Sequence, residues 1–212
     1  MLDLSKISQP DAVIVQNGLK ALGFYDGTTR GIPGPKTKAA YKKFLANGKK
    51  LEKPEAANAL VQRLIATLVK EEGVREYPRN SNRGKRVEEF QAATWLNGTS
   101  WPWCAAFICW GLKKIDDKST LPFKRPRTAA AWGFEQWARD EGLTLYKPRK
   151  KIKAGDIVMF TFSHIGLAIE DESRGYVKTV EGNTSTSGSR EGGGVYIQKR
   201  KTSLIRSHIR VF

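Results

Sequence analysis

The sequence has few residues of the kinds that bind metals or form disulfides: two cysteines and two histidines among 212 residues. Cys104 and Cys109 lie five positions apart. Within one helix this spacing puts their Cα atoms too far apart, and on different faces, for a disulfide. The four residues also lack the spacing of zinc ligands, which argues against a structural zinc site. The thiols and imidazoles therefore remain available for other chemistry.

Long apolar runs are absent as well. No run approaches the roughly 18 apolar residues that a membrane-spanning helix needs. Residues 1–20 lack the basic region and following apolar core of a signal peptide. We therefore expect no transmembrane segment, and a substrate outside the cytoplasm requires another route of delivery or release.

Acidic residues are scarce relative to basic ones, with 21 Asp and Glu against 37 Lys and Arg, a formal net charge of +16. The basic excess is spread along the chain, which predicts attraction to a polyanion rather than the reading of one nucleotide sequence. Anionic envelope polymers, lipopolysaccharide, anionic membranes and nucleic acid are the candidate partners. No recognition helix, RNA motif or interleaving of aromatic and basic residues points to specific nucleic-acid binding.

The first part of the chain, residues 1–48, is predicted to form a small all-α unit. Apolar side chains recur at helical spacing in residues 11–22, and Gly23 ends this pattern. After an irregular segment, Thr37 is a suitable N-cap for a second helix. Residues 49–54 combine charge and proline with little apolar content, which predicts a linker.

The remainder, residues 55–212, is predicted to be α+β. Residues 55–72 form an amphipathic helix with a broad apolar face. Further helices are expected at residues 85–95, from Cys104 onward, and at 128–140. From residue 151 the pattern changes to that of an antiparallel β-meander, with strands at 156–160, 163–170, 176–181, 195–198 and 207–211. Helices followed by strands are typical of the α+β class.

The segment around Cys104 is the strongest candidate for chemistry. Trp101-Pro102-Trp103 precedes Cys104, and an apolar run follows it. This pattern places the Cys104 thiol at a helix N-terminus, where unpaired N–H groups and the helix dipole favour a thiolate, the form that acts as a nucleophile. The alternative is a buried, inert cysteine, which is the role that we expect for Cys109.

A nucleophilic thiol needs a base, and the base needs a group that orients it. His164, at the start of a predicted strand, is the preferred base, and His208, in a basic terminal strand, is expected to be a surface or edge residue. Glu181 and Asn183 lie on the next strand, two positions apart, so their side chains should point to the same face. Either of them could accept a hydrogen bond from His164.

The order of these residues resembles the CHAP family of cysteine peptidoglycan hydrolases, part of the papain-like, NlpC/P60-like group. The resemblance rests on four blocks: Trp103–Phe107, Lys153–Val158, His164–Ala168 and Glu181–Thr184. It implies a papain-like CHAP domain with Cys104 as nucleophile, His164 as base, Glu181 as orienting residue and Asn183 as an accessory polar group. Some CHAP domains bind calcium through an acidic loop ahead of the cysteine. Residues 78–84 contain no Asp or Glu, so we predict no metal and no cofactor.

The first unit resembles the helical peptidoglycan-binding module of cell-wall hydrolases. The resemblance is carried by Leu22–Gly27 and Gly34–Ala40, together with Gln16, Leu19 and Phe44. By this resemblance, the residues expected to contact the wall are Phe24, Tyr25, Asp26, Gly34 and Thr37. The alternative is a small helical packing unit without wall affinity.

The chemistry expected of such a site is amide hydrolysis through a thioester. The backbone N–H of Cys104 is the expected oxyanion donor, and Asn82 is a second candidate. Trp101 and Trp103 are expected to form the walls of a groove for a glycan-linked peptide. Amidase cleavage between muramic acid and L-alanine and endopeptidase cleavage within the stem peptide use the same residues, so the choice between them stays open.

The sequence is therefore interpreted as a monomeric phage endolysin. Such a protein is made in the host cytoplasm and reaches the cell wall through a holin-made lesion or from outside. The alternatives are a secreted antibacterial toxin with the same chemistry and a non-catalytic wall-binding protein in which Cys104 is structural.

Overall fold

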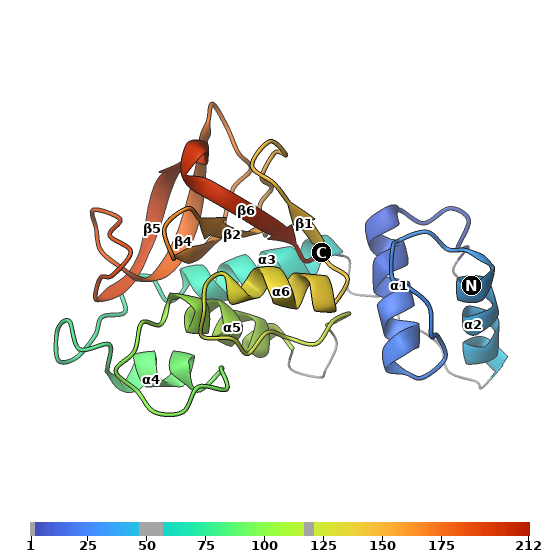
Figure 1. Cartoon of the computed structure of the whole chain (residues 1–212), viewed down its shortest axis with the longest axis horizontal. Helices are drawn as coiled ribbons and strands as arrows, with labels where there is room; N and C mark the ends of the chain where they lie inside the picture. Colours follow the sequence, from blue (N-terminus) through green and yellow to red (C-terminus); the bar gives the residue numbers. More distant parts are fainter. Residues whose placement is uncertain (1–2, 47–56, 117–120) are drawn as a thin grey trace.

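The computed structural model describes residues 3–46, 57–116 and 121–212, which form a pair of helices and a larger body of helices and sheet (Figure 1). The predicted linker, residues 49–54, lies outside the described residues.

The helix pair consists of α1 (Gln9–Ala21) and α2 (Pro35–Ala46). Ser8 caps α1 by accepting a hydrogen bond from the backbone N–H of Asp11. The prediction that Thr37 caps the second helix is wrong, because α2 begins at Pro35, a residue whose fixed φ suits the first turn. Thr37 instead lies inside the unit, where its Oγ1 accepts a hydrogen bond from Gln16 at 3.0 Å.

A buried glutamine holds the loop between these two helices. The Gln16 side chain accepts from the backbone N–H of Gly31 at 2.9 Å and donates to the carbonyl of Ile32 at 2.9 Å. Around it lies a small apolar core that includes Leu19, Tyr41 and Phe44. The segment between α1 and α2 is thus fixed from within, although it has no regular secondary structure.

The larger body contains the helices α3 (Ala57–Val69), α4 (Lys85–Gln91), α5 (Cys104–Ile115) and α6 (Gly133–Asp140). Each coincides with a predicted helix, but α4 ends four residues early and α6 begins five residues late, relative to 85–95 and 128–140. Within the described ranges, no helix is long and apolar enough to cross a membrane.

The sheet has six strands: β1 (Thr144–Tyr146), β2 (Ile157–Phe160), β3 (Ile165–Ala168), β4 (Tyr176–Thr184), β5 (Gly194–Lys201) and β6 (Ile205–Arg210). Their order is β1-β6-β2-β3-β4-β5, and every neighbouring pair is antiparallel. Strands β2 to β5 form the predicted meander. Strand β6 departs from it by returning to lie between β1 and β2, and the three-residue β1 was not predicted.

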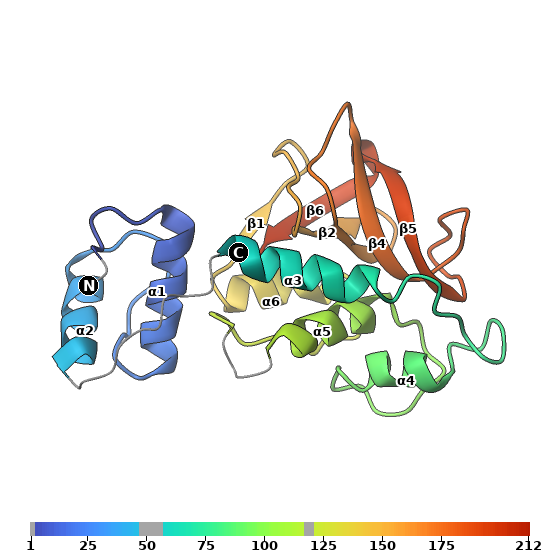
Figure 2. The same ribbon diagram turned by 180° about the vertical axis from the view of Figure 1, so that it is seen from behind.

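Helices α3, α5 and α6 lie on one face of this sheet (Figures 1 and 2). Helix α5 is the centre of the main core, since it packs against α3 and α4 and against β3 and β4. Its residues are apolar on nearly every side, as expected of a helix surrounded by protein. This mixture of helices and antiparallel sheet is the predicted α+β class.

Candidate active site

The Cys104 thiol stands at the first residue of α5 and is only 6% exposed. Trp103, before it, has φ −117° and ψ 14° and lies outside the helix. The first N–H groups of a helix have no acceptor within the helix, and their dipoles favour a negative charge nearby. The first turn of α5 contains no acidic residue that would oppose this effect.

His164 lies immediately before β3 and is fully buried. Its Nε2 is 2.9 Å from Oε2 of Glu181, and its Nδ1 has no hydrogen-bond partner among the described residues. Burial lowers the pKa of His164, but its interactions with the Cys104 and Glu181 side chains outweigh this effect and raise the pKa to about 9. Nδ1 is thus the ring atom available to the Cys104 sulfur.

Besides His164, two other side chains donate hydrogen bonds to the Glu181 carboxylate. Thr179 Oγ1 donates to Oε1 at 2.5 Å, Arg200 Nε donates to Oε1 at 2.8 Å, and Arg200 Nη2 donates to Oε2. Burial raises the pKa of Glu181, but the hydrogen bonds from Arg200 and His164 lower it below its ordinary range. The carboxylate therefore stays ionised and accepts hydrogen bonds from His164 and from Arg200.

Asn183 has a different set of contacts from the expected one, since no hydrogen bond joins it to His164 in the described structure. Its Oδ1 accepts from the backbone N–H of Trp103 at 3.0 Å, and its Nδ2 donates to Asn82 Oδ1 at 3.1 Å and to Glu76 Oε1 at 3.3 Å. The strand register shifts between Glu181 and Thr184, and Asn183 has φ 57°. This bulge breaks the alternation on which the prediction of a shared face rested.

The expected tryptophan walls are only partly present. Trp103 is fully buried and donates from Nε1 to Glu76 Oε1 at 2.9 Å, so the prediction that it lines a groove is wrong. Its ring packs in the main core against Phe90 and Phe107. Trp101 is half-buried and can line a groove, and Asn82 is half-buried with its Oδ1 already accepting from Asn183.

Another tryptophan lies beside the His164 turn. Trp132 is 40% exposed. Its Nε1 donates to the carbonyl of Phe160 at 3.1 Å, and the backbone N–H of Phe160 donates to the carbonyl of His164 at 3.0 Å. The Arg206 guanidinium lies 4.6 Å from the centroid of the indole. Trp132 is therefore an exposed but firmly held aromatic ring at this end of the sheet.

The second histidine lies apart from Cys104. His208 was expected at a surface or an edge, but it is fully buried, because β1 covers β6 on its outer side. Its ring lies 5.1 Å from that of Tyr146, and its Nε2 is 3.6 Å from Asp156 Oδ2. Burial is the main cause that lowers the pKa of His208, against the opposing effect of Asp156. His208 is thus a neutral core residue.

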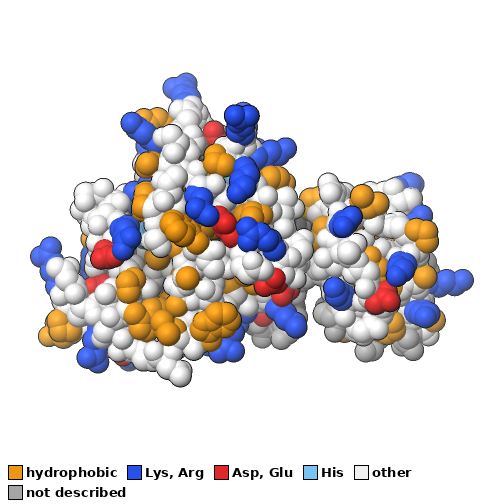
Figure 3. All heavy atoms as spheres, viewed as in Figure 1, with side chains coloured by type: hydrophobic (Ala, Val, Ile, Leu, Met, Phe, Trp, Pro, Cys, Tyr) orange, Lys and Arg blue, Asp and Glu red, His pale blue; other side chains and the backbone are white. Residues whose placement is uncertain are grey.

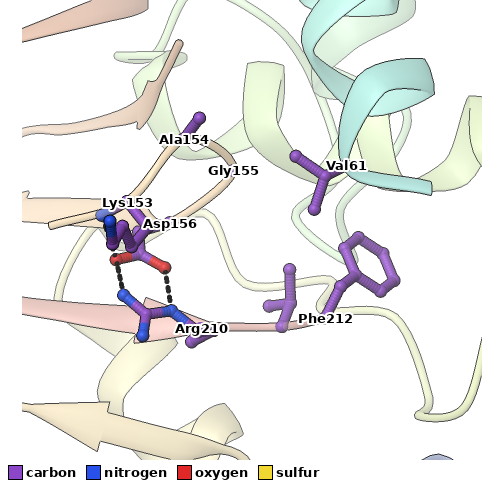
Figure 4. A pocket seen from close by; sticks show the side chains of 8 residues that line it. Val61, Lys153, Ala154, Gly155, Asp156, Arg210 and Phe212 are labelled. Carbon is purple, nitrogen blue, oxygen red and sulfur yellow. Dashed lines mark hydrogen bonds and ion pairs between the residues drawn. The ribbon is translucent and has the colours of Figure 1, made fainter. Parts of the chain in front are cut away.

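A cavity elsewhere in the larger body has no comparable chemistry. It lies between α3 and the start of β2, and its lining includes Val61, Gly155 and Phe212 (Figure 4). Its charged groups are paired, since Arg210 donates to Asp156 from Nε at 2.9 Å and from Nη2 at 2.8 Å. This cavity contains neither the thiol nor His164.

The residues predicted to contact the cell wall lie mostly inside the helix pair. Thr37 and Tyr25 are buried, and the Tyr25 hydroxyl donates to the carbonyl of Thr28 at 2.9 Å. Phe24 packs edge-on against Phe44 at 5.5 Å. Asp26 is exposed, and Gly34 is half-buried. The pattern that carries the resemblance is therefore largely a pattern of packing, and wall binding by this unit stays a prediction.

Sequence reasoning did not identify Thr179, Arg200 or Glu76. Arg200 stands in the basic run 199–201, where alternation alone does not separate a buried guanidinium from exposed neighbours. In the described part of the chain, no three His, Cys, Asp or Glu side chains are grouped as metal ligands would be.

The order thiol, imidazole and carboxylate is the one that thiol hydrolases use. Residues 95–183 match the CHAP domain family, a range that includes Cys104, His164, Glu181 and Asn183. CHAP domains are typically cysteine-dependent peptidoglycan hydrolases, so the match supports peptidoglycan as substrate and a CHAP-type hydrolase activity. No curated protein matches the chain.

Proposed function

We propose that the protein hydrolyses an amide bond of bacterial peptidoglycan through a thioester on Cys104. The observation that carries this proposal is the free Nδ1 of His164. Its Nε2 is fixed by Glu181 at 2.9 Å, so the ring offers its other nitrogen to the thiol at the start of α5. The CHAP match independently points to the same chemistry.

The reaction begins with a thiolate on Cys104 beside a protonated His164 ring, whose pKa of about 9 keeps it charged at neutral pH. The sulfur attacks the substrate carbonyl, and the backbone N–H of Cys104 stabilises the oxyanion. Nδ1 of His164 then donates its proton to the leaving amine. Water attacks the thioester while the same nitrogen takes up a proton, and Cys104 is released.

The substrate surface in this proposal contains Trp101 on the side of the thiol and Trp132 beside the His164 turn. Flat aromatic faces suit sugar rings and peptide backbone alike, and both indoles are tied down by their N–H groups, to Gly98 and Phe160. A rigid aromatic wall loses little entropy when a substrate binds.

In biological terms we propose a monomeric endolysin in which the α1–α2 unit adheres to the wall. On the face shown in Figure 3, Lys and Arg side chains are scattered over both the helix pair and the larger body and outnumber Asp and Glu. A net charge of +16 favours contact with anionic envelope polymers. Release through a holin-made lesion and access from outside are both compatible with this role.

The test is clearing of purified sacculi by Cys104→Ala, with Cys109→Ala as the matched control. Cys109 is in the same helix, and its buried Sγ lies 3.5 Å from the carbonyl of Thr128, where burial raises the pKa of the thiol. We expect Cys104→Ala to abolish clearing and Cys109→Ala to keep it. Mass spectrometry of the released muropeptides then separates amidase from endopeptidase cleavage. Clearing by a folded Cys104→Ala protein contradicts the proposal.

A further inference from the structure

Arg200, on β5, is a buried cation whose ion-pair partner in the described structure is Glu181. Its side chain is 9% exposed. Nε and Nη2 bind the two oxygens of Glu181 in a bidentate arrangement, which is the strongest geometry available to a guanidinium and a carboxylate. This pair lies directly behind the contact between Glu181 and His164.

Other contacts fix the guanidinium in this place. Nη1 donates to the carbonyl of Gly188 at 2.9 Å, and the guanidinium carbon Cζ lies 5.1 Å from the Phe160 ring centroid and 5.7 Å from that of Phe162. Gly188 has φ 77°, and a Cβ there would lie 2.6 Å from Nη1, so this close approach requires glycine. The guanidinium thus has little freedom to leave Glu181.

Behind the Cys104 thiol, three groups of alternating charge contact one another in turn: the His164 imidazolium, the Glu181 carboxylate and the Arg200 guanidinium. His164 must lose its proton when the amine leaves. At that moment a buried Glu181 carboxylate with no other cation would be uncompensated, which is costly in a protein interior. An arginine does not deprotonate, so it supplies the same compensation at each step.

We propose that Arg200 is a positioning residue for the reaction: its guanidinium keeps the Glu181 carboxylate ionised and aimed at Nε2 of His164 while His164 gains and loses its proton. This inference rests on the proposed function. It assigns Arg200 no contact with substrate. Its effect passes through Glu181 to the ring and so to the nitrogen that serves the thiol.

The first experiment compares Arg200→Gln with the wild-type protein by NMR titration of the His164 ring and by the pH dependence of kcat. Loss of the cation should let Glu181 take up a proton, so the His164 pKa should fall below about 9. The basic limb of kcat should move to lower pH by the same amount. We expect kcat to fall by about 10- to 100-fold, part of what positioned acid–base catalysis supplies, with little change in KM.

Arg210→Gln is the matched control. Arg210 also makes a bidentate pair with a buried carboxylate, Asp156, in the same sheet. Its loss should lower stability without moving the His164 titration or kcat. Arg200→Lys keeps the positive charge but cannot form the bidentate pair with Glu181, so its kcat should lie between those of Arg200→Gln and the wild-type protein. An unchanged or raised His164 pKa in Arg200→Gln overturns the proposal.

A double-mutant cycle covers the case in which Arg200→Gln does not fold. Glu181→Gln/Arg200→Gln removes both buried charges together and leaves no unpaired ion. If Arg200 acts through Glu181, the double variant should have nearly the same kcat as Glu181→Gln alone. A further loss of kcat of about 10-fold or more relative to Glu181→Gln alone would mean that Arg200 acts by another route, and the proposal would fail.

The titration also separates this inference from the proposed function, because it needs no substrate. A wild-type protein that clears no sacculi but whose His164 responds to Arg200→Gln as expected would contradict the proposed function alone. Normal clearing by Arg200→Gln, with an unshifted His164, would contradict only the role of Arg200.

Discussion

Nε2 of His164 lies 2.9 Å from Oε2 of Glu181, and neither side chain is exposed to solvent. A carboxylate in this position fixes which ring nitrogen points away from it and stabilises the protonated ring. The orientation of His164 toward Cys104 is therefore a consequence of Glu181.

Glu181→Gln tests this dependence. The amide can still accept a hydrogen bond from Nε2, but it carries no charge, so the His164 pKa should fall and the basic limb of kcat should move to lower pH. We expect kcat to drop by about 100-fold, measured by release of amines from purified peptidoglycan. Glu135→Gln is the control, since Glu135 is also buried and bound by an arginine, Arg206, but lies on α6. A Glu135→Gln loss of equal size would point to general destabilisation.

Stability should fall toward alkaline pH because of His164. Its folded pKa of about 9 lies above its ordinary 6.5, so its contribution is fully present below 6.5 and is lost as pH rises through 9. The loss is on the order of 3 kcal/mol. Urea unfolding at pH 6 and at pH 9.5 should reveal it, and His164→Ala should remove most of the difference. An equal pH dependence in His164→Ala would assign the effect to other groups.

His208 should have the opposite effect, because burial lowers its pKa. The neutral ring is favoured in the folded state, so its contribution is present above pH 6.5 and is lost as pH falls below that value. His208→Phe, which cannot be protonated, should flatten the acidic side of the unfolding curve between pH 6.5 and pH 5 and leave the alkaline side unchanged. A change confined to the alkaline side would contradict this assignment.

Local patterns were sufficient to place Cys104 at a helix start and Glu181 on the strand next to His164. The apolar run after Cys104 and the alternation within each strand are short-range signals that tertiary contacts reinforce here. Helix α5 is apolar on nearly every side, apart from Lys113 and Lys114 in its last turn, so its composition predicts its position in the core between the sheet and α3.

The features that the sequence did not predict depend on contacts between residues far apart in the chain. Strand β6 pairs with β2 although the strands β3, β4 and β5 separate the two in the sequence, and His208 therefore lies between β1 and β2 in the sheet. The bulge near Asn183 shifts the register of β4, so the Asn183 side chain binds the backbone N–H of Trp103 and not the predicted partner, His164. Arg200 approaches Glu181 along β5, although Glu181 is paired with Tyr196. The residues next to each of these positions in the sequence contain no pattern that predicts the feature.

The last prediction concerns Asn183, whose side chain joins the residue before Cys104 to the loop that contains Glu76 and Asn82. Asn183→Asp keeps the acceptor for the Trp103 N–H but replaces the donor facing Glu76 with a second carboxylate oxygen. Two buried carboxylates with one hydrogen-bond donor fewer should cost about 3 kcal/mol of unfolding free energy at neutral pH.

Urea unfolding of Asn183→Asp measures this cost, with the exposed Asn97→Asp as its control. Since Glu76 is the cause of the repulsion, Glu76→Gln in the Asn183→Asp background should recover more than half of the lost free energy. The alkylation rate of Cys104 should fall in Asn183→Asp, because repulsion from Glu76 shifts the new carboxylate away from the Trp103 N–H at the start of α5. A stable Asn183→Asp protein with an unchanged alkylation rate would mean that the Trp103 N–H alone anchors this end of the helix.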